Sequence, residues 1–221
     1  MLDLAPLERL RKNNEQKAIA ALRGVCFNGN EKPLLINISL NIFPRNLYFV
    51  SGDDLNGASH LLQIMQGVVK PSSGQIFFKS NLRKTYLNPY ELNTLSSLTL
   101  DQIINLLIDQ NKDFNEYSFL KSKFDFKVSD QSKLSEIKVM DQRKFLWILT
   151  FLQDPDLILA DKMMEGLDLE EQVKLLAFIK QRMNERAFST IFSEKSLEVT
   201  KHVKSDVLIL QDGIIDFRMR S

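Results

Sequence analysis

The chain has 221 residues, of which 44% are hydrophobic, so it can bury one good core as a single domain or as a domain with a smaller lobe. Its 29 Lys and Arg residues and 28 Asp and Glu residues give a net charge of +1, which argues against a nucleic-acid-binding surface. The single cysteine, Cys26, excludes an internal disulfide and fits a reducing compartment. The sequence has no run of about 18 apolar residues and no signal-peptide core. We therefore expect a soluble, cytosolic protein that reaches a membrane only through a partner.

The N-terminal part of the chain is predicted to contain an extension followed by two strands. Residues 1–17 form the extension, in which leucines have a partly helical spacing with basic residues between them. Such a segment can dock on a partner or a membrane surface, or it can pack on its own domain or fray. Residues 18–27 and 34–43 are apolar or alternating, which is typical of antiparallel strands, and Asn28-Gly29-Asn30 is the predicted turn.

A phosphate-binding loop, G-x-x-x-x-G-K-[ST], is indicated between a predicted strand at 46–51 and a predicted helix at 61–65. In such a loop the backbone N–H groups hold the phosphates, and the lysine reaches the β and γ phosphates. Alanine stands at the lysine position here, and two aspartates oppose a polyphosphate unless magnesium intervenes. An ordinary glycine turn is the alternative. The candidate nucleotide-binding residues are Gly52, Asp53, Asp54, Leu55, Asn56, Gly57, Ala58, Ser59 and His60.

Further landmarks follow in a fixed order. Residues 71–76 have the form P-x-x-G-x-I, an apolar strand ends in Leu159-Ala160-Asp161, and Glu165-Gly166-Leu167-Asp168 comes next. From about residue 19 to residue 213 the chain resembles an ABC transporter-type ATPase subunit. Its length, the short segment between its halves and the Leu-Ala-Asp ending most resemble the FtsE-like cell-division and LolD-like lipoprotein-release subgroup.

This resemblance implies an α/β fold, the P-loop NTPase fold of ABC type. It consists of a mixed sheet flanked by helices, an inserted helical lobe and an N-terminal antiparallel β subdomain. The implied single cassette covers residues 18–221, with a core at 18–87 and 137–221 and the helical lobe at 88–136.

The resemblance also indicates where two nucleotide contacts should lie. The aromatic residue that stacks on adenine in the family would fall at Asn28, and Phe27 comes one residue early. Since a one-residue slip turns a strand side chain to the other face, we expect Phe27 in the core. The glutamine that senses metal and water at the start of the lobe is replaced by Asn88, which alternatively begins a turn before Pro89.

The signature motif of the family is degenerate in this chain. An ungapped count along the helix that precedes residue 154 places the motif at Ile137, Lys138, Val139, Met140 and Asp141, rather than at Leu134-Ser135-Glu136. In an active dimer the amides of this motif bind the γ-phosphate held by the opposite subunit. The glycine pair that permits this close approach is missing in either register.

The groups that handle the γ-phosphate are also replaced. By resemblance, Ser59 and Asp161 are the magnesium-binding residues. Lys162 stands where the family has its general base, and it cannot accept a proton at neutral pH unless its pKa is strongly lowered. Glu194 stands in place of the switch histidine. Because these two positions adjoin in the family, we predict an ion pair between Lys162 and Glu194, with both side chains in solvent as the alternative.

Together these departures predict a catalytically inactive pseudo-ATPase with degenerate positions Ala58, Lys162, Glu194 and Asn88. Its expected role is cytoplasmic docking of an integral membrane subunit at the inner face of the membrane. It would not require ATP and magnesium and would bind them weakly. Alternatives are an ATPase in which Lys162 swings to the γ-phosphate, and a nucleotide sensor that pairs with an active cassette.

The family's D-loop, which crosses between two cassettes, corresponds to Glu165, Gly166, Leu167 and Asp168. Its presence predicts a homodimer or heterodimer of cassettes. In the alternative reading this segment simply begins a helix, with Asp168 as its capping residue.

Overall fold

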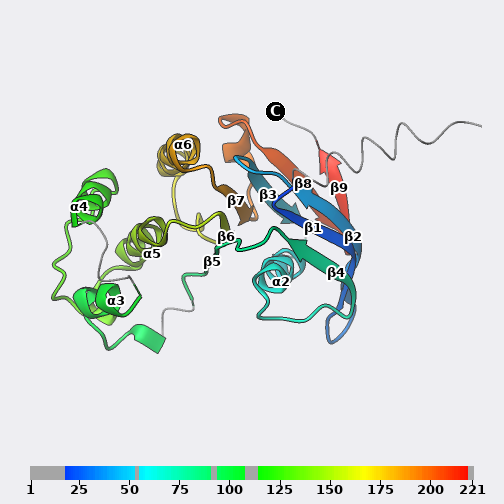
Figure 1. Ribbon diagram of the computed structural model, residues 1–221, viewed down its shortest axis with the longest axis horizontal. Helices are drawn as coiled ribbons and strands as arrows, with labels where there is room; N and C mark the ends of the chain where they lie inside the picture. Colours follow the sequence, from blue (N-terminus) through cyan, green and yellow to red (C-terminus); the bar gives the residue numbers. More distant parts are fainter. Residues whose placement is uncertain (1–17, 53–54, 91–93, 108–113, 219–221) are drawn as a thin grey trace, which may run out of the picture. The chain divides into compact units, whose positions relative to one another are not determined.

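The computed structural model describes residues 18–52, 55–90, 94–107 and 114–218 (Figure 1). The predicted extension at 1–17 and the loop aspartates Asp53 and Asp54 therefore lie outside the described residues. The chain forms two compact units. One contains the described residues up to Tyr86 and from Asp156 onward, and the other contains Leu87–Pro155. The second unit is longer than the lobe expected at 88–136, because it includes a further helix that the sequence analysis assigned to the core.

The first unit contains a three-stranded antiparallel sheet with the order β2-β1-β4. Its strands are β1 (Ala20–Asn28), β2 (Pro33–Ile42) and β4 (Ser73–Phe78). The β1–β2 turn is closed by a 3.0 Å hydrogen bond from Gly29 N to Lys32 O. Gly74 has a φ of +86°, and a Cβ there would overlap the backbone of Gly24 on β1, so only glycine fits. This sheet matches the expected N-terminal β subdomain.

A six-stranded mixed sheet with the order β5-β6-β7-β3-β8-β9 forms the rest of the core. Strands β6, β7, β3 and β8 pair in parallel, and β9 is antiparallel to β8. Strands β6 and β7 are buried at every position, as expected for parallel strands covered on both faces. The strands are β3 (Leu47–Gly52), β5 (Lys84–Leu87), β6 (Leu157–Asp161), β7 (Ser189–Ser193), β8 (Asp206–Gln211) and β9 (Ile214–Arg218).

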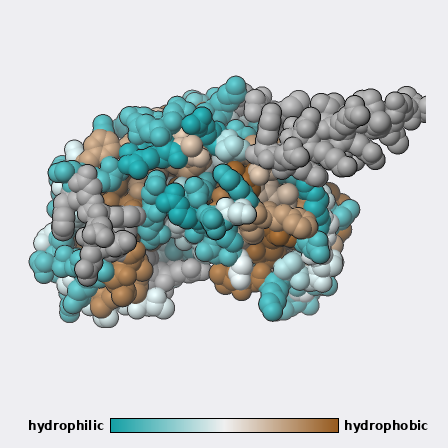
Figure 2. Space-filling view, viewed as in Figure 1, coloured by the Kyte–Doolittle hydropathy of each residue, from teal (hydrophilic) through white to brown (hydrophobic). Residues whose placement is uncertain are grey.

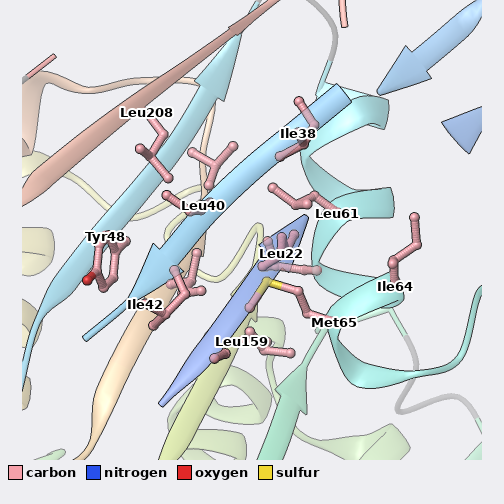
Figure 3. Close-up of a cluster of buried hydrophobic side chains, with 14 of the residues drawn as sticks. Leu22, Ile38, Leu40, Ile42, Tyr48, Leu61, Ile64, Met65, Leu159 and Leu208 are labelled. Atoms are coloured by element: carbon pink, nitrogen blue, oxygen red, sulfur yellow. The ribbon is translucent and has the colours of Figure 1, made fainter. Parts of the chain in front are cut away.

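Helix α2 (Leu55–Gln66) supplies much of the apolar core of this unit. Its residues Leu61 and Met65 are fully buried and point toward strand residues such as Leu22 and Leu159 (Figure 3). Replacing such a leucine by alanine typically costs about 2–5 kcal/mol. Helix α6 (Leu169–Arg186) and the 3-10 helix η3 (Glu198–Lys201) complete the unit. Because Gly57, Ala58 and Ser59 lie in the first turns of α2, the packing of this helix fixes the position of these candidate-site residues.

The second unit is helical. It contains α3 (Leu100–Leu107), α4 (Phe114–Lys123), the 3-10 helix η2 (Leu134–Glu136) and α5 (Val139–Gln153). Its interior includes the stacked rings of Phe126 and Phe145, whose centroids are 5.9 Å apart. Asp130 accepts hydrogen bonds from Lys121 Nζ at 2.8 Å and from Tyr117 Oη at 2.6 Å, which ties α4 to the following loop. Among the described residues, no helix is long and apolar enough to cross a membrane.

Candidate functional site

The candidate site lies at the carboxyl ends of the parallel strands, where β3 ends at Gly52, β6 at Asp161 and β7 at Ser193. Ligands of open α/β sheets bind at this edge. Asp161 pairs in register with Ser193, so the residues that follow these two strands are neighbours, as the sequence analysis expected. The six-stranded sheet therefore brings together segments that lie more than a hundred residues apart.

The two loop glycines are required by packing inside the chain. A Cβ on Gly52 would overlap the carbonyl oxygen of Leu210 on β8, and a Cβ on Gly57 would lie 2.6 Å from Leu210 Cδ2 and 3.0 Å from Leu34 O. Such close approach of the backbone favours glycine whether or not a phosphate binds. The glycine spacing thus has a structural cause of its own. The side chains of Leu55 and Asn56 are not described.

Ala58, at the position of the phosphate-binding lysine, is fully buried. It belongs to the apolar core cluster, together with Leu61 and Leu62 of the same helix. The side chain that should carry positive charge to the β and γ phosphates instead contributes a methyl group to the core. The described part of the loop therefore keeps its two glycines but lacks the positively charged side chain that would bind phosphate.

Asp161 is buried, and both its carboxylate oxygens accept hydrogen bonds from hydroxyl groups. Ser59 Oγ donates to Oδ1 and Tyr86 Oη donates to Oδ2, each at 2.8 Å. A buried carboxylate is costly unless it is hydrogen-bonded, and these two donors satisfy it. Sequence reasoning missed Tyr86. The available signal was its position near the end of a short strand, two residues before Asn88.

The predicted ion pair between Lys162 and Glu194 is wrong. Glu194 is buried, and its Oε1 accepts a 2.7 Å hydrogen bond from the backbone N–H of Met164. Lys162 has a left-handed backbone with φ 55°, and its N–H donates to Ser193 O at 3.0 Å. No ion pair joins Lys162 to Glu194 in the described part of the chain. The two residues do lie at adjacent strand ends, but a backbone amide in the loop after β6 binds the carboxylate.

The region expected for adenine holds a stacked pair of side chains. The rings of Phe27 and His60 have centroids 4.7 Å apart and an interplanar angle of 25°. Phe27 also packs against the core cluster, which confirms its expected place. Asn28, at the adenine position, is exposed, and its backbone N–H donates to Ser72 Oγ at 3.0 Å. Sequence reasoning placed His60 at the start of a helix but did not foresee the stacking.

Asn88 adopts the turn that was the alternative to a metal-sensing role. Its Oδ1 accepts a 2.9 Å hydrogen bond from the backbone N–H of Tyr90, two residues later. This is the local side-chain turn that asparagine commonly forms. In this conformation Asn88 stabilises the backbone next to Pro89.

The candidate signature residues surround the beginning of α5. Lys138 is the N-cap without a side-chain cap hydrogen bond, and Val139 begins the helix with 59% of its surface exposed. The competing segment Leu134-Ser135-Glu136 forms the 3-10 helix η2. The ungapped register thus places Val139, Met140 and Asp141 in the first turn of a helix, and their role in nucleotide binding stays a prediction.

The candidate D-loop leads into α6. Asp168 Oδ1 accepts a 2.8 Å hydrogen bond from Glu171 N, and Glu171 Oε2 accepts a 3.1 Å hydrogen bond from Asp168 N. This reciprocal arrangement is a capping box. Glu165, Gly166 and Asp168 are exposed. The capping role is therefore present, and the dimer contact stays a prediction.

The fit of magnesium and ATP to this site is mixed. Ser59 and Asp161 are adjacent oxygen donors of the kind that magnesium binds in phosphate sites. The described residues contain no group of three or more His, Cys, Asp or Glu side chains that could hold a metal by themselves. The position of the phosphate-binding cation is apolar. Magnesium could be held by these two residues only together with a nucleotide, for which the loop lacks its lysine.

The sheet order, the inserted helical unit and the succession of β3 by α2 define the class: the chain has the fold of an ATP-binding cassette. The structure of CbiO1 from Clostridium perfringens, part of the ABC transporter complex CbiONQ, superimposes with a TM-score of 0.73 at 15% identity over 90% of this chain and 87% of that one. The structure of another ATP-binding subunit of an ABC transporter gives a TM-score of 0.74 at 16% identity over 91% and 90%. The predicted fold is confirmed.

Sequence comparison adds relatives, although no protein-family model matches the chain. The zinc import ATP-binding protein ZnuC of Buchnera aphidicola subsp. Baizongia pistaciae is 27% identical over 195 residues, which cover 87% of this chain and 81% of the relative. ZnuC of Rickettsia prowazekii is 25% identical over 206 residues, covering 90% and 85%. The chain is thus related to the ATP-binding subunits of ABC transporters, as its motifs predicted.

Proposed function

We propose that this chain is an ABC-type subunit that does not hydrolyse ATP and that serves as a cytoplasmic docking component of a membrane complex. The observation that carries the proposal is the burial of Ala58 in the apolar core, at the position from which a lysine should reach the phosphates. A missing charge-assisted hydrogen bond to phosphate weakens binding by roughly 1.5–3 kcal/mol.

The surroundings of Asp161 support the absence of hydrolysis. The residue after Asp161 is Lys162, where the family has its general base, and an ammonium group has no lone pair with which to accept a proton. Glu194, at the position of the switch histidine, accepts a hydrogen bond from the backbone N–H of Met164 and is a carboxylate rather than an imidazole. Because the phosphate-binding lysine, the general base and the switch histidine of the family are all replaced, the residues of this chain would stabilise the transition state of ATP hydrolysis only weakly.

Weak nucleotide binding remains compatible with the site. Ser59 and Asp161 keep the oxygens that bind magnesium, while Tyr86 already occupies one oxygen of Asp161. When bound, Mg–ATP would contribute its own charge neutralisation, and Ser59 and Asp161 would position the metal. We propose that nucleotide is not required for docking.

The proposed partner is an integral membrane subunit, which meets this chain on the cytoplasmic face. The zinc import names of the relatives make zinc import the first process to test. The FtsE-like assignment stays part of the proposal and rests on chain length and the Leu159-Ala160-Asp161 ending.

A candidate docking surface lies on α3, where Leu106 and Leu107 have 64% and 43% of their surfaces exposed. Figure 2 shows apolar residues at the surface where Figure 1 draws α3. Such residues offer apolar contact to a short helix of the partner.

Nucleotide affinity and turnover of the purified chain test the proposal. We expect no measurable ATPase activity and weak ATP binding, with and without magnesium. A turnover that Asp161→Asn abolishes would establish the alternative ATPase, in which Lys162 serves the γ-phosphate. Tight ATP binding without hydrolysis, seen only when the chain is paired with an active cassette, would establish the nucleotide sensor instead.

Docking is tested by co-purification with candidate integral membrane subunits of an ABC-type complex. Leu106→Asp on α3 should release the partner, whereas Asp161→Ala should leave the complex intact. Release by Asp161→Ala and retention with Leu106→Asp would mean that nucleotide governs assembly.

A further inference from the structure

A cavity lined by basic side chains lies in the first unit, at the amino ends of strands β3 and β8. It has a volume of about 340 Å³. Arg45 contributes from the turn before β3, Lys180 from α6, and Lys204 from the segment before β8. The candidate loop begins at the opposite end of β3, six residues of strand away, a span of roughly 20 Å. The cavity is therefore separate from the nucleotide site.

The charges around this cavity are unbalanced. Three basic side chains line it, and Asp206 is the one carboxylate among the described residues that do so. Their formal charges of +3 and −1 leave +2. Neither Arg45, Lys180 nor Lys204 makes an ion pair within the described part of the chain. Positive charges gathered in this way are more stable when an anion binds among them.

Two neighbouring groups are unsatisfied without a ligand. Ser205 is buried, lines the cavity, and has a hydroxyl oxygen with no hydrogen-bond partner among the described residues. Lys180 is half-buried, and burial followed by repulsion from Lys204 lowers its pKa. The direction of this shift agrees with the lack of an ion pair to Lys180 among the described residues. A buried hydroxyl without a partner normally calls for an explanation, such as an absent water or ion.

We infer that this cavity binds a phosphate group, held by Arg45, Lys180 and Lys204. A phosphomonoester carries a charge of about −1.5 to −2 at neutral pH, which matches the net charge of the lining residues. Arginine supplies a planar fork of donors for phosphate oxygens, and lysine supplies point charges. Asn46 and Asn184 line the same cavity, and the side-chain amide of Asn184 can add a neutral donor. The assignment is independent of whether the chain hydrolyses ATP.

Titration of the full chain with inorganic phosphate, at constant ionic strength maintained with chloride, tests the site by ¹⁵N-resolved NMR. We expect saturable shifts at Arg45, Lys180 and Ser205, and none at Gly57 or Ser59. Lys180→Gln and Lys204→Gln should each weaken binding about tenfold, as expected for losing one charged contact. The matched control is Lys174→Gln, because Lys174 lies on the same helix with 71% of its side chain exposed.

The inference would be overturned by the absence of saturable binding, or by equal affinity of the Lys180, Lys204 and Lys174 variants. Shifts confined to Gly57 and Ser59 would assign the phosphate to the nucleotide loop and would equally overturn it. Glycerol phosphate and vesicles of phosphatidic acid in phosphatidylcholine distinguish the source of the phosphate. Either probe supports the site if its binding is lost in Lys180→Gln and kept in Lys174→Gln.

Discussion

The hydroxyl of Tyr86 donates a 2.8 Å hydrogen bond to Oδ2 of Asp161, and this contact joins the end of β5 to the end of β6. Ser59 Oγ donates to the other oxygen of the same carboxylate, so three elements meet at one buried charge. The network satisfies Asp161 without a ligand. It can therefore stabilise the fold even if the site has no catalytic role.

Tyr86→Phe should lower the free energy of unfolding by about 1–3 kcal/mol, because it leaves one oxygen of a buried carboxylate with one donor fewer. Urea denaturation of wild type and variant measures the difference. Tyr90→Phe is the control, since Tyr90 is 57% exposed and water can replace a lost partner. Equal stability of Tyr86→Phe and wild type would contradict a structural role of this bond.

Ala58→Lys should destabilise the protein by about 1–3 kcal/mol through overpacking alone, because Ala58 is fully buried in the core. It should improve nucleotide binding at most, and hydrolysis should stay absent because Lys162 still occupies the base position. Ala58→Met is the matched control, since it adds a side chain of similar length without the charge. ATP hydrolysis by Ala58→Lys would show that the lysine alone was missing.

Glu194→Ala should cost about 1–3 kcal/mol, because it leaves the backbone N–H of Met164 without its acceptor. Glu194→Gln keeps an acceptor oxygen and should cost less. In a double-mutant cycle, Lys162→Met and Glu194→Gln should be additive within about 0.5 kcal/mol. A coupling energy above about 1 kcal/mol would show that the Lys162 and Glu194 side chains interact after all.

Asp168→Ala should reduce stability by about 1 kcal/mol, because it removes the side-chain cap of α6. Asp168→Asn retains an acceptor for Glu171 N and should cost a few tenths of a kcal/mol. Thermal unfolding measures both effects. Sedimentation of the same variants tests the predicted cassette dimer, and dissociation caused by Asp168→Asn, with its cap intact, would reveal an interface role beyond capping.

In the helical unit, Asp130→Asn should cost about 0.5–1 kcal/mol after solvent screening is considered, because Lys121 and Asp130 retain 24% and 35% exposure. The amide oxygen can still accept from Tyr117. Asp125→Asn is the matched control, because the Asp125–Lys127 pair is exposed on both sides, and it should not change stability measurably. Equal effects of the two substitutions would mean that the Asp130 network does not stabilise this unit.

Much of the fold could be predicted from local patterns. The apolar run before Asp161 and the run from Leu47 to Gly52 became parallel strands because strands buried on both faces need continuous apolar residues. The glycine spacing located the turn from β3 into α2, since close backbone approach permits few other residues. These features depend on residue type and spacing, which the sequence shows directly. The adjacency of Lys162 and Glu194 was expected instead from the resemblance to ABC transporter-type subunits.

The contacts made at the site were decided only by tertiary structure. A carboxylate can accept from any nearby donor, so the sequence did not reveal that Glu194 would bind the amide of Met164. Nor did it reveal the bond between Tyr86 and Asp161, which lie 75 residues apart. Spacing determines which backbone segments meet, whereas the choice among competing donors depends on side-chain directions that are set when the sheets and α2 pack together.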